Sequence, residues 1–346
     1  MGRTDHAGAA PGSVGPMSPH PALGVTYASL AALGVPGGVE VSRAAERLGY
    51  RSFWVAEANG TEAFSLLGAA GQASPNLDLG TGVLALQLRT PPLVAMAAAT
   101  LQALHPDREI IIGVGISSPV VAGRWHGARY ESTRPLAQTR EYVTVLRECL
   151  AGETVSFQGD FYEISRFRLG VRLGERRPKI VLGALHAGML RLAGELADGV
   201  LLNYIPASHV PWSIEQVRKG GSATIYAYIH AGLVADRSDG IDAARRDLFS
   251  YAVVDAYADS FSRAGFADEV AEIRERHKAG DREGAIGAVS DRMVDAIDVM
   301  GHGDTVRDTV RAYLAAGVEV PVLMPLPWGK DRMGVTVATM EAAAQA

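Results

Sequence analysis

Small and polar residues follow several apolar runs of this sequence, at the points where predicted strands end. Glu57 comes directly after the apolar run Ser52–Ala56, and Gly82 lies within the run Leu77–Ala85. The run Arg108–Val114 leads into Gly115 and two serines. Strand ends without side chains suit a flat ligand that lies against the backbone, and a carboxylic acid beside it can transfer a proton.

The segment Leu77–Gly115 has the pattern of a strand, a helix and a second strand. Pro91 and Pro92 open an alanine-rich stretch that stops near His105, and proline is well suited to the first turn of a helix. The nearly continuous apolar run that follows is typical of a strand buried on both faces. This unit therefore predicts two parallel strands joined by a helix.

The same alternation continues along the chain and predicts eight parallel strands, each with a following helix. The predicted strands are Ala22–Tyr27, Ser52–Ala56, Leu77–Ala85, Arg108–Val114, Lys179–Gly183, Gly199–Asn203, Thr224–His230 and Val318–Met324. Eight units without a break in composition favour a (β/α)8 barrel of the TIM type. One miscounted strand would make an open doubly wound sheet equally consistent with the pattern.

We expect one barrel domain over residues 21–330, after a disordered tail rich in Gly, Ala, Pro and Ser over residues 1–20. Two segments are longer than a simple connection needs and are predicted insertions, at about 116–178 and 240–300. The first contains a hairpin, Thr154–Ile164. Residues 331–346 are predicted to form a C-terminal helix or tail.

The composition excludes several classes of protein. The chain is 48% hydrophobic and 21% charged, with a net charge of −5, which gives no reason to bind nucleic acid or an anionic membrane. The only cysteine is Cys149, so no disulfide can form within the chain, and a cytoplasmic location is expected. No apolar run approaches the roughly 18 to 20 residues that span a bilayer.

No motif for metal or phosphate chemistry is present. The sequence lacks HExxH, paired CxxC, a phosphate loop ending in GKS or GKT, and the nucleophile elbow GxSxG. A Gly-x-Gly-x-x-Gly after the first strand is also missing, which counts against a nicotinamide-binding Rossmann domain. We therefore expect no metal site, and a barrel mouth that binds an organic cofactor carrying the chemistry itself.

Several motifs in this order resemble the bacterial-luciferase-like superfamily, and within it the branch that uses the deazaflavin coenzyme F420. The motifs are Trp54-Val-Ala-Glu57, Gly80-Thr-Gly-Val83, Leu104-His-Pro-Asp-Arg108 with Gly113-Val-Gly115, Trp125-His126-Gly127, the hairpin around Gly159, and Leu192-Ala-Gly-Glu-Leu-Ala-Asp-Gly-Val200. The resemblance covers roughly Leu23 to Leu326.

The resemblance implies a TIM-type barrel with an insertion, a homodimer, and a tricyclic ring over the carboxyl end of the barrel. It also implies a cis peptide bond at Gly82-Val83 and a cofactor phosphate held by backbone amides after the fourth and fifth barrel strands. The cofactor-binding residues carried over are Tyr27, Gly82, Val83, Gly115, Ile116, Ser117, Ser118, Gly183, Ala184, Leu185, His186 and Ala187.

One position departs from the family pattern. Sugar-phosphate dehydrogenases of this branch have a histidine directly after the acid of the second strand, and this chain has Ala58 there. A glucose-6-phosphate dehydrogenase role is therefore not expected. The remaining candidate for proton transfer is Glu57, with Asn59 as its hydrogen-bonding neighbour; an equally open alternative is that Glu57 only orients the cofactor or pairs with an arginine.

The predicted function is hydride transfer between the C5 atom of coenzyme F420 and a small organic substrate. One alternative is a monooxygenase of the same fold that uses FMN. A second alternative is a barrel that binds flavin, or a partner, without catalysis. We expect an organic substrate rather than a highly charged one.

Overall fold

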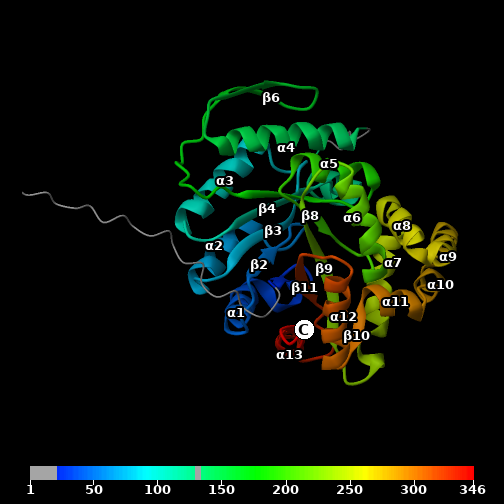
Figure 1. Cartoon of the computed structure of the whole chain (residues 1–346). Coiled ribbons are helices and arrows are strands. Elements are labelled where there is room, and N and C mark those ends of the chain that lie inside the picture. The colour runs from blue at the N-terminus through cyan, green and yellow to red at the C-terminus, as the bar shows by residue number, and fades with distance from the viewer. Residues whose placement is uncertain (1–21, 129–133) are drawn as a thin grey trace, which may run out of the picture.

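Eight parallel strands close into a barrel in the computed structural model, which describes residues 22–128 and 134–346. The sheet has the order β10-β9-β11-β1-β2-β3-β4-β7-β8, and pairing of β9 with β8 closes the ring (Figure 1). The barrel strands are β1 (Gly24–Thr26), β2 (Ser52–Val55), β3 (Asp78–Ala85), β4 (Ile110–Gly115), β7 (Lys179–Gly183), β8 (Gly199–Leu202), β9 (Thr224–Leu233) and β11 (Val320–Pro325). The predicted barrel is confirmed, and the open sheet is excluded because β8, at one end of the strand order, pairs with β9 near the other end.

The helices follow the strands in the alternation that the sequence predicts. Their bounds are α1 (Gly34–Arg47), α2 (Ala63–Ala73), α3 (Pro91–Leu104), α4 (Pro135–Ala151), α5 (Ala187–Leu196), α6 (Val210–Arg218), α7 (Ile241–Ala252), α8 (Asp255–Phe261), α9 (Ala267–Lys278), α10 (Arg282–Gly287), α11 (Asp291–Ile297), α12 (Gly303–Ala315) and α13 (Arg332–Ala343). α3 begins at Pro91, as expected. None of the helices in the described part of the chain is long and apolar enough to cross a membrane.

The pairing of β3 with β4 shifts register between Thr81 and Leu84, and the peptide bond Gly82-Val83 within this shift is cis. The cis bond expected at this position is confirmed. Two hydrogen bonds hold the irregular backbone: Thr81 Oγ1 donates to the Gly113 carbonyl at 3.0 Å, and the Tyr228 hydroxyl donates to the Gly82 carbonyl at 2.7 Å. The carboxyl end of β3 is thereby tied to both β4 and β9.

Large side chains fill the inside of the barrel below this level. The cluster comprises Trp54, Ile111, Val181, Leu201, Tyr226, Tyr228, Val322 and Met324. Trp54 is fully buried, and its indole N–H donates to Ser52 Oγ at 2.8 Å. Because the interior is packed rather than open, a ligand has room only at one end of the barrel, which in barrels of this type is the carboxyl end of the strands.

Two groups of elements lie outside the barrel alternation (Figure 1). The antiparallel hairpin β5 (Val155–Gln158) and β6 (Glu163–Phe167) lies beside α4, where Glu141 accepts from the backbone N–H of Asp160 and of Phe161, both at 2.9 Å. On another side, α7 to α11 enclose a second apolar core of their own.

Some expectations differ from the structure or fall outside it. A short strand, β10 (Val299–Gly301), pairs with the end of β9 and was not predicted, because three residues are too few to show an alternating pattern. Residues 119–125 form a π-helical turn where a loop was expected. The expected tail over residues 1–20 lies outside the described residues.

Candidate active site

A cavity of about 550 Å³ lies at the carboxyl ends of β3, β4, β7 and β8. Most of the expected cofactor-binding residues line it: Gly82, Val83, Gly115, Ile116, Ser117, Ser118, Gly183, Ala184, Leu185 and His186. The opposite wall comes from the segment around α8, with Val254, Asp255, Ala256, Tyr257 and Asp259. The structure therefore gathers residues from distant parts of the chain around one hollow of ligand size.

Glycines keep the floor of this cavity open on both sides of Val83. A Cβ atom on Gly115 would lie 3.1 Å from Val83 Cγ2, and one on Gly183 would lie 3.2 Å from Val83 Cγ1. Longer side chains at these two positions would occupy the space above the valine. A flat ring fits such a floor, because it needs a smooth apolar surface and close approach to the backbone.

Two of the backbone amides expected to hold a phosphate are engaged within the protein. The amide of Ser117 donates to Gln87 Oε1 at 3.2 Å, and that of Ala184 donates to the Leu201 carbonyl at 3.3 Å. Within residues 22–128 and 134–346, the amides of Ser118, Leu185 and His186 have no such partner. Among the described residues, no side chain caps the start of α5. The backbone N–H groups at the amino end of this helix are therefore also suited to bind an anion.

Tyr27 and Ala187, also expected to bind the cofactor, are not among the residues that line the cavity. The Tyr27 hydroxyl donates to the Gly34 carbonyl, and its ring packs against Phe53 with the centroids 6.4 Å apart. Burial raises the pKa of this hydroxyl. Tyr27 thus joins β1 to the start of α1, and its cofactor role stays a prediction.

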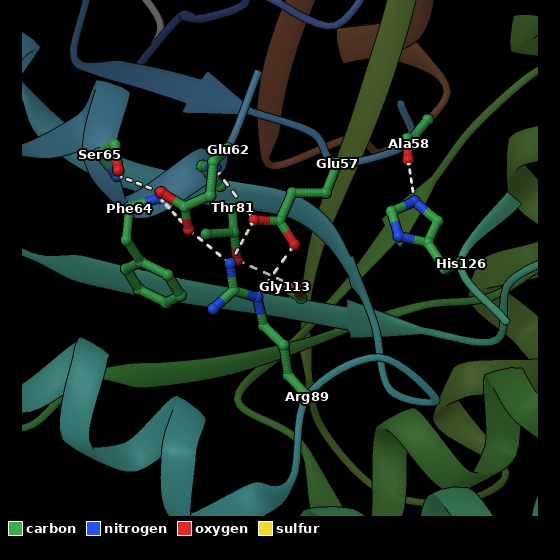
Figure 2. A network of polar contacts seen from close by, with 10 residues as sticks. Glu57, Ala58, Glu62, Phe64, Ser65, Thr81, Arg89, Gly113 and His126 are labelled. Carbon is green, nitrogen blue, oxygen red and sulfur yellow. Dashed lines mark hydrogen bonds and ion pairs between the residues drawn. The ribbon is translucent and has the colours of Figure 1, made fainter. Parts of the chain in front are cut away.

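Glu57 forms an ion pair with Arg89, which Figure 2 shows together with Glu62. Arg89 Nη2 and Nε donate to the two carboxylate oxygens at 2.8 and 3.0 Å, and the amide of Ala63 donates at 3.0 Å. The hydrogen bond with Glu57 raises the pKa of Arg89. Pairing with an arginine is the alternative that the sequence left open for Glu57.

Neither Glu57 nor Asn59 is among the cavity residues, and Asn59 is exposed. The neighbouring carbonyl of Ala58 contacts His126 Nε2 at 2.5 Å (Figure 2). This contact joins the loop after β2 to the segment that contains His126. Proton transfer by Glu57 stays a prediction; in the structure its carboxylate accepts three hydrogen bonds.

A buried polar network behind the cavity was not predicted as a site. Asn203 lines the cavity, and His230 Nε2 lies 2.9 Å from Asn203 Oδ1. His230 Nδ1 lies 3.0 Å from Asp298 Oδ1, and the Tyr204 hydroxyl donates to Asp247 Oδ2 at 2.7 Å. Burial raises the pKa of both aspartates to about 7 and lowers the pKa of His230 to about 4.

A family model described as luciferase-like monooxygenase matches residues 22–319. The chain belongs to this family. The match spans seven of the eight barrel strands and ends directly before β11, so it includes every element that lines the cavity.

Two relatives in this family are similar over most of their length. The chain is 30% identical over 312 residues to a Mycobacterium tuberculosis protein provisionally named a coenzyme F420-dependent oxidoreductase, covering 82% of this chain and 89% of the relative. It is 28% identical over 306 residues to the 5,10-methylenetetrahydromethanopterin reductase of Archaeoglobus fulgidus, covering 83% and 89%. The resemblance to the F420-dependent branch is thereby confirmed.

Solved structures show the same fold. The coenzyme F420-dependent tetrahydromethanopterin reductase from Methanopyrus kandleri superimposes with a TM-score of 0.77 at 23% identity, covering 94% of this chain and 98% of that one. An F420-dependent secondary alcohol dehydrogenase in complex with an F420-acetone adduct gives a TM-score of 0.72 at 18% identity, covering 94% and 99%.

The Glu57–Arg89 pair yields a stability prediction. Replacing Arg89 by leucine leaves a carboxylate that is only 12% exposed without its charged partner, and we expect a loss of about 3 kcal/mol in the free energy of unfolding. Urea denaturation measures it. Arg89→Leu combined with Glu57→Gln should lose less than the sum of the single changes, whereas strict additivity would show that the two side chains are not coupled.

Proposed function

We propose that this chain is an F420-dependent oxidoreductase that moves a hydride between the deazaflavin and a small organic substrate. The observation that carries the proposal is the cavity, where the glycine-flanked floor at Val83 lies together with backbone amides that have no hydrogen-bond partner among the described residues. Two kinds of relative support it: an oxidoreductase and a reductase, the first of them named for its dependence on F420.

The residues present fit this cofactor. Gly82, Val83, Gly115 and Gly183 would lie against the ring, and the amides of Ser118, Leu185 and His186 would bind a phosphate. Bound F420 supplies a two-electron carrier that accepts or gives a hydride at C5. The protein contributes position: Tyr228 and Thr81 fix the backbone on which the ring would rest.

The cavity walls point to the kind of substrate. Ile116, Leu185, Met189 and Val254 give apolar surface, which suits the hydrocarbon part of an organic substrate. Two carboxylates, Asp255 and Asp259, also line the cavity, and they disfavour a second anion beside the phosphate that the backbone amides would bind. We therefore propose an uncharged or cationic organic substrate without a phosphate group.

Anaerobic turnover tests the proposal. Reduced F420 is mixed with the protein and with a panel of enones and imines, and oxidised F420 with alcohols, while absorbance near 420 nm is followed. We expect saturable turnover with at least one uncharged acceptor or donor, and its loss in Gly183→Leu, whose side chain would fill the floor beside Val83. Turnover confined to phosphorylated substrates would contradict the substrate class.

An FMN-dependent monooxygenase is the second candidate, because the matching family model is described as luciferase-like monooxygenase. It predicts tight binding of FMN and turnover that consumes oxygen. A barrel that binds a flavin without catalysis would bind one cofactor and react with nothing in either assay. Measuring oxygen uptake with FMN beside the anaerobic F420 assay separates the three.

We also propose a homodimer. Leu93 and Met96 of α3 and Leu136 of α4 are 46%, 49% and 41% exposed, and the two helices pack against each other. Exposed apolar side chains on neighbouring helices are typical of an interface. Light scattering after size exclusion should give twice the chain mass, and Leu93→Glu with Met96→Glu should give the monomer; an unchanged mass in that variant would place the interface elsewhere.

A further inference from the structure

Asn203 is the first residue after β8, and its side-chain amide faces the cavity. Behind it lie His230 of β9 and Asp298, which follows α11, with exposed fractions of 2% and 1%. Asp247 of α7 and the Tyr204 hydroxyl complete the group. The insertion that contains α7 to α11 therefore places two acids near Asn203, on the side away from the cavity. Binding of the cofactor does not require these acids.

The hydrogen bonds fix which atoms carry hydrogen. The backbone N–H of Tyr204 donates to Asn203 Oδ1 at 3.0 Å, so the atom facing it must be the amide oxygen. His230 Nε2 contacts the same oxygen at 2.9 Å and must therefore carry the imidazole hydrogen. In a neutral ring Nδ1 is then an acceptor, and Asp298 Oδ1 at 3.0 Å has to donate to it.

The burial of His230 and Asp298 favours the uncharged form of both side chains. A fully buried imidazolium and carboxylate would each lose their hydration, and burial lowers the pKa of His230 while it raises the pKa of Asp298. Asp298 Oδ2 is buried and has no hydrogen-bond partner among the described residues. A carboxylic acid tolerates one bare carbonyl oxygen much better than a carboxylate does.

The groups facing Asp298 come from several elements. Asp247 and Tyr251 lie on α7, Tyr204 follows β8, Tyr313 lies on α12, and His230 is the hydrogen-bond acceptor. No lysine or arginine appears among these groups. The acid therefore has no cationic partner that would favour its ionised form.

A metal ion is a weaker reading of the same cluster. His230, Asp247 and Asp298 each have one ligand atom within 4.8 Å of the others. Both imidazole nitrogens, however, already have hydrogen-bond partners. A metal would have to displace at least one of them, and then the orientation of Asn203 would change as well.

The Asn203 amide oxygen is occupied by two donors, so its NH2 group is what remains for the cavity. Tyr257 also lines the cavity; burial raises the pKa of its hydroxyl, and a hydrogen bond from Asn203 partly offsets this. The NH2 group thus lies beside the Tyr257 hydroxyl. The floor at Val83 and this pair of polar groups belong to the same cavity.

The geometry points to Asn203 as a ligand-binding residue whose amide NH2 donates to an acceptor atom of the molecule in the cavity, held in that orientation by His230 and a protonated Asp298. This inference rests on the proposed function and gives it a substrate class, a carbonyl or imine compound. When hydride adds to carbon, the π electron pair moves to oxygen or nitrogen, which then takes a proton from water. A fixed N–H donor stabilises that developing charge.

The protonation pattern is tested without cofactor or turnover. Nitrogen-15 NMR of histidine-labelled protein at pH 6 should show His230, assigned by the loss of its signals in His230→Gln, as the neutral ring with hydrogen on Nε2. An imidazolium, or hydrogen on Nδ1, would overturn the assignment. Addition of Zn²⁺ or Mn²⁺ should leave these signals unchanged, whereas a shift at stoichiometric metal would favour the metal reading.

Variants test the ligand contact. Asn203→Leu should lower kcat/KM for the best panel substrate by about 100-fold, the usual effect of removing one such donor, with little change in the Kd of oxidised F420. Weakening of F420 binding by tenfold or more would instead assign the acceptor atom to the cofactor. No change in either quantity would overturn the role of Asn203.

Asp298 is tested by a conservative pair of variants. Asp298→Asn keeps a donor toward His230 Nδ1 and should retain kcat/KM within a few-fold, whereas Asp298→Leu should resemble Asn203→Leu. Equal loss in both would show that the carboxylate acts as an ion. Asp78→Leu removes a buried acid at the amino end of β3 and should leave kcat/KM of the folded protein unchanged. If the wild-type protein neither binds F420 nor reacts, the proposed function is refuted. The NMR result would still decide the protonation states of His230 and Asp298.

Discussion

Replacing Gly82 by alanine is expected to lower the free energy of unfolding by about 2 to 3 kcal/mol and to weaken cofactor binding at least tenfold. A Cβ atom at this position would lie 1.8 Å from the Tyr228 hydroxyl oxygen and 2.9 Å from Tyr228 Cζ. Tyr228 is only 2% exposed and packs within the barrel cluster, so it has little room to withdraw. The backbone beneath the proposed ring must then move. Urea denaturation and F420 titration measure the two effects.

Two further variants control this result. A Cβ on Gly68 of α2 would meet nothing within 4 Å, and Gly68→Ala should leave stability equal or slightly higher, since alanine favours a helix. Tyr228→Phe removes the oxygen that the Gly82 Cβ would meet first, so the double variant should recover part of the loss. Wild-type stability in Gly82→Ala, or no recovery in the double variant, would contradict the contact as described.

The stability of the wild type relative to Asp298→Asn is expected to fall as the pH rises from about 4 to about 7. Burial raises the pKa of Asp298 in the folded protein to about 7, against an ordinary value of 3.8. The folded state thus keeps a proton that the unfolded state releases. Its contribution is complete below pH 3.8, is lost as the pH rises through about 7, and changes by about 1.4 kcal/mol per pH unit in between.

Denaturation at pH 5, 6, 7 and 8 measures this difference. Between pH 5 and 7 it should change by about 2 to 3 kcal/mol in favour of Asp298→Asn, and it should then level off. Asp304→Asn, whose side chain is 82% exposed in the wild type, serves as a control with a constant difference. A constant difference for Asp298→Asn would mean that this acid is ionised in the folded protein throughout.

The barrel could be predicted from the sequence because its strands are parallel and covered by helices. Strands such as Ile110–Gly115 are buried along their whole length and therefore give continuous apolar runs. β10 was not predicted because three residues are too few to show a hydrophobic periodicity. The π-helical turn at residues 119–125 was not predicted because Pro119 and Gly123 are as common in loops as at the start of a helix.

The cavity residues at the ends of β3, β4 and β7 were also predictable, because they are glycines and main chain at strand ends. Gly115 and Gly183 flank Val83 as a flat ligand would need. The polar network behind the cavity was not predictable, because Asp247 and Asp298 belong to a long helical insertion and are 51 residues apart in the sequence. Nothing in their local pattern shows that both meet His230. Similarly, the partner of Glu57 is Arg89, 32 residues away, and sequence reasoning could only leave that pairing open.

The most direct test of the central claim is an equilibrium titration of the purified protein with oxidised F420 and, in parallel, with FMN. F420 fluorescence and FMN fluorescence report the two bindings under the same conditions. We expect saturable binding of F420, at least tenfold weaker binding of FMN, and loss of F420 binding in Gly183→Leu with the fold intact. Tight binding of FMN without F420 binding, or F420 binding that survives in Gly183→Leu, would contradict it.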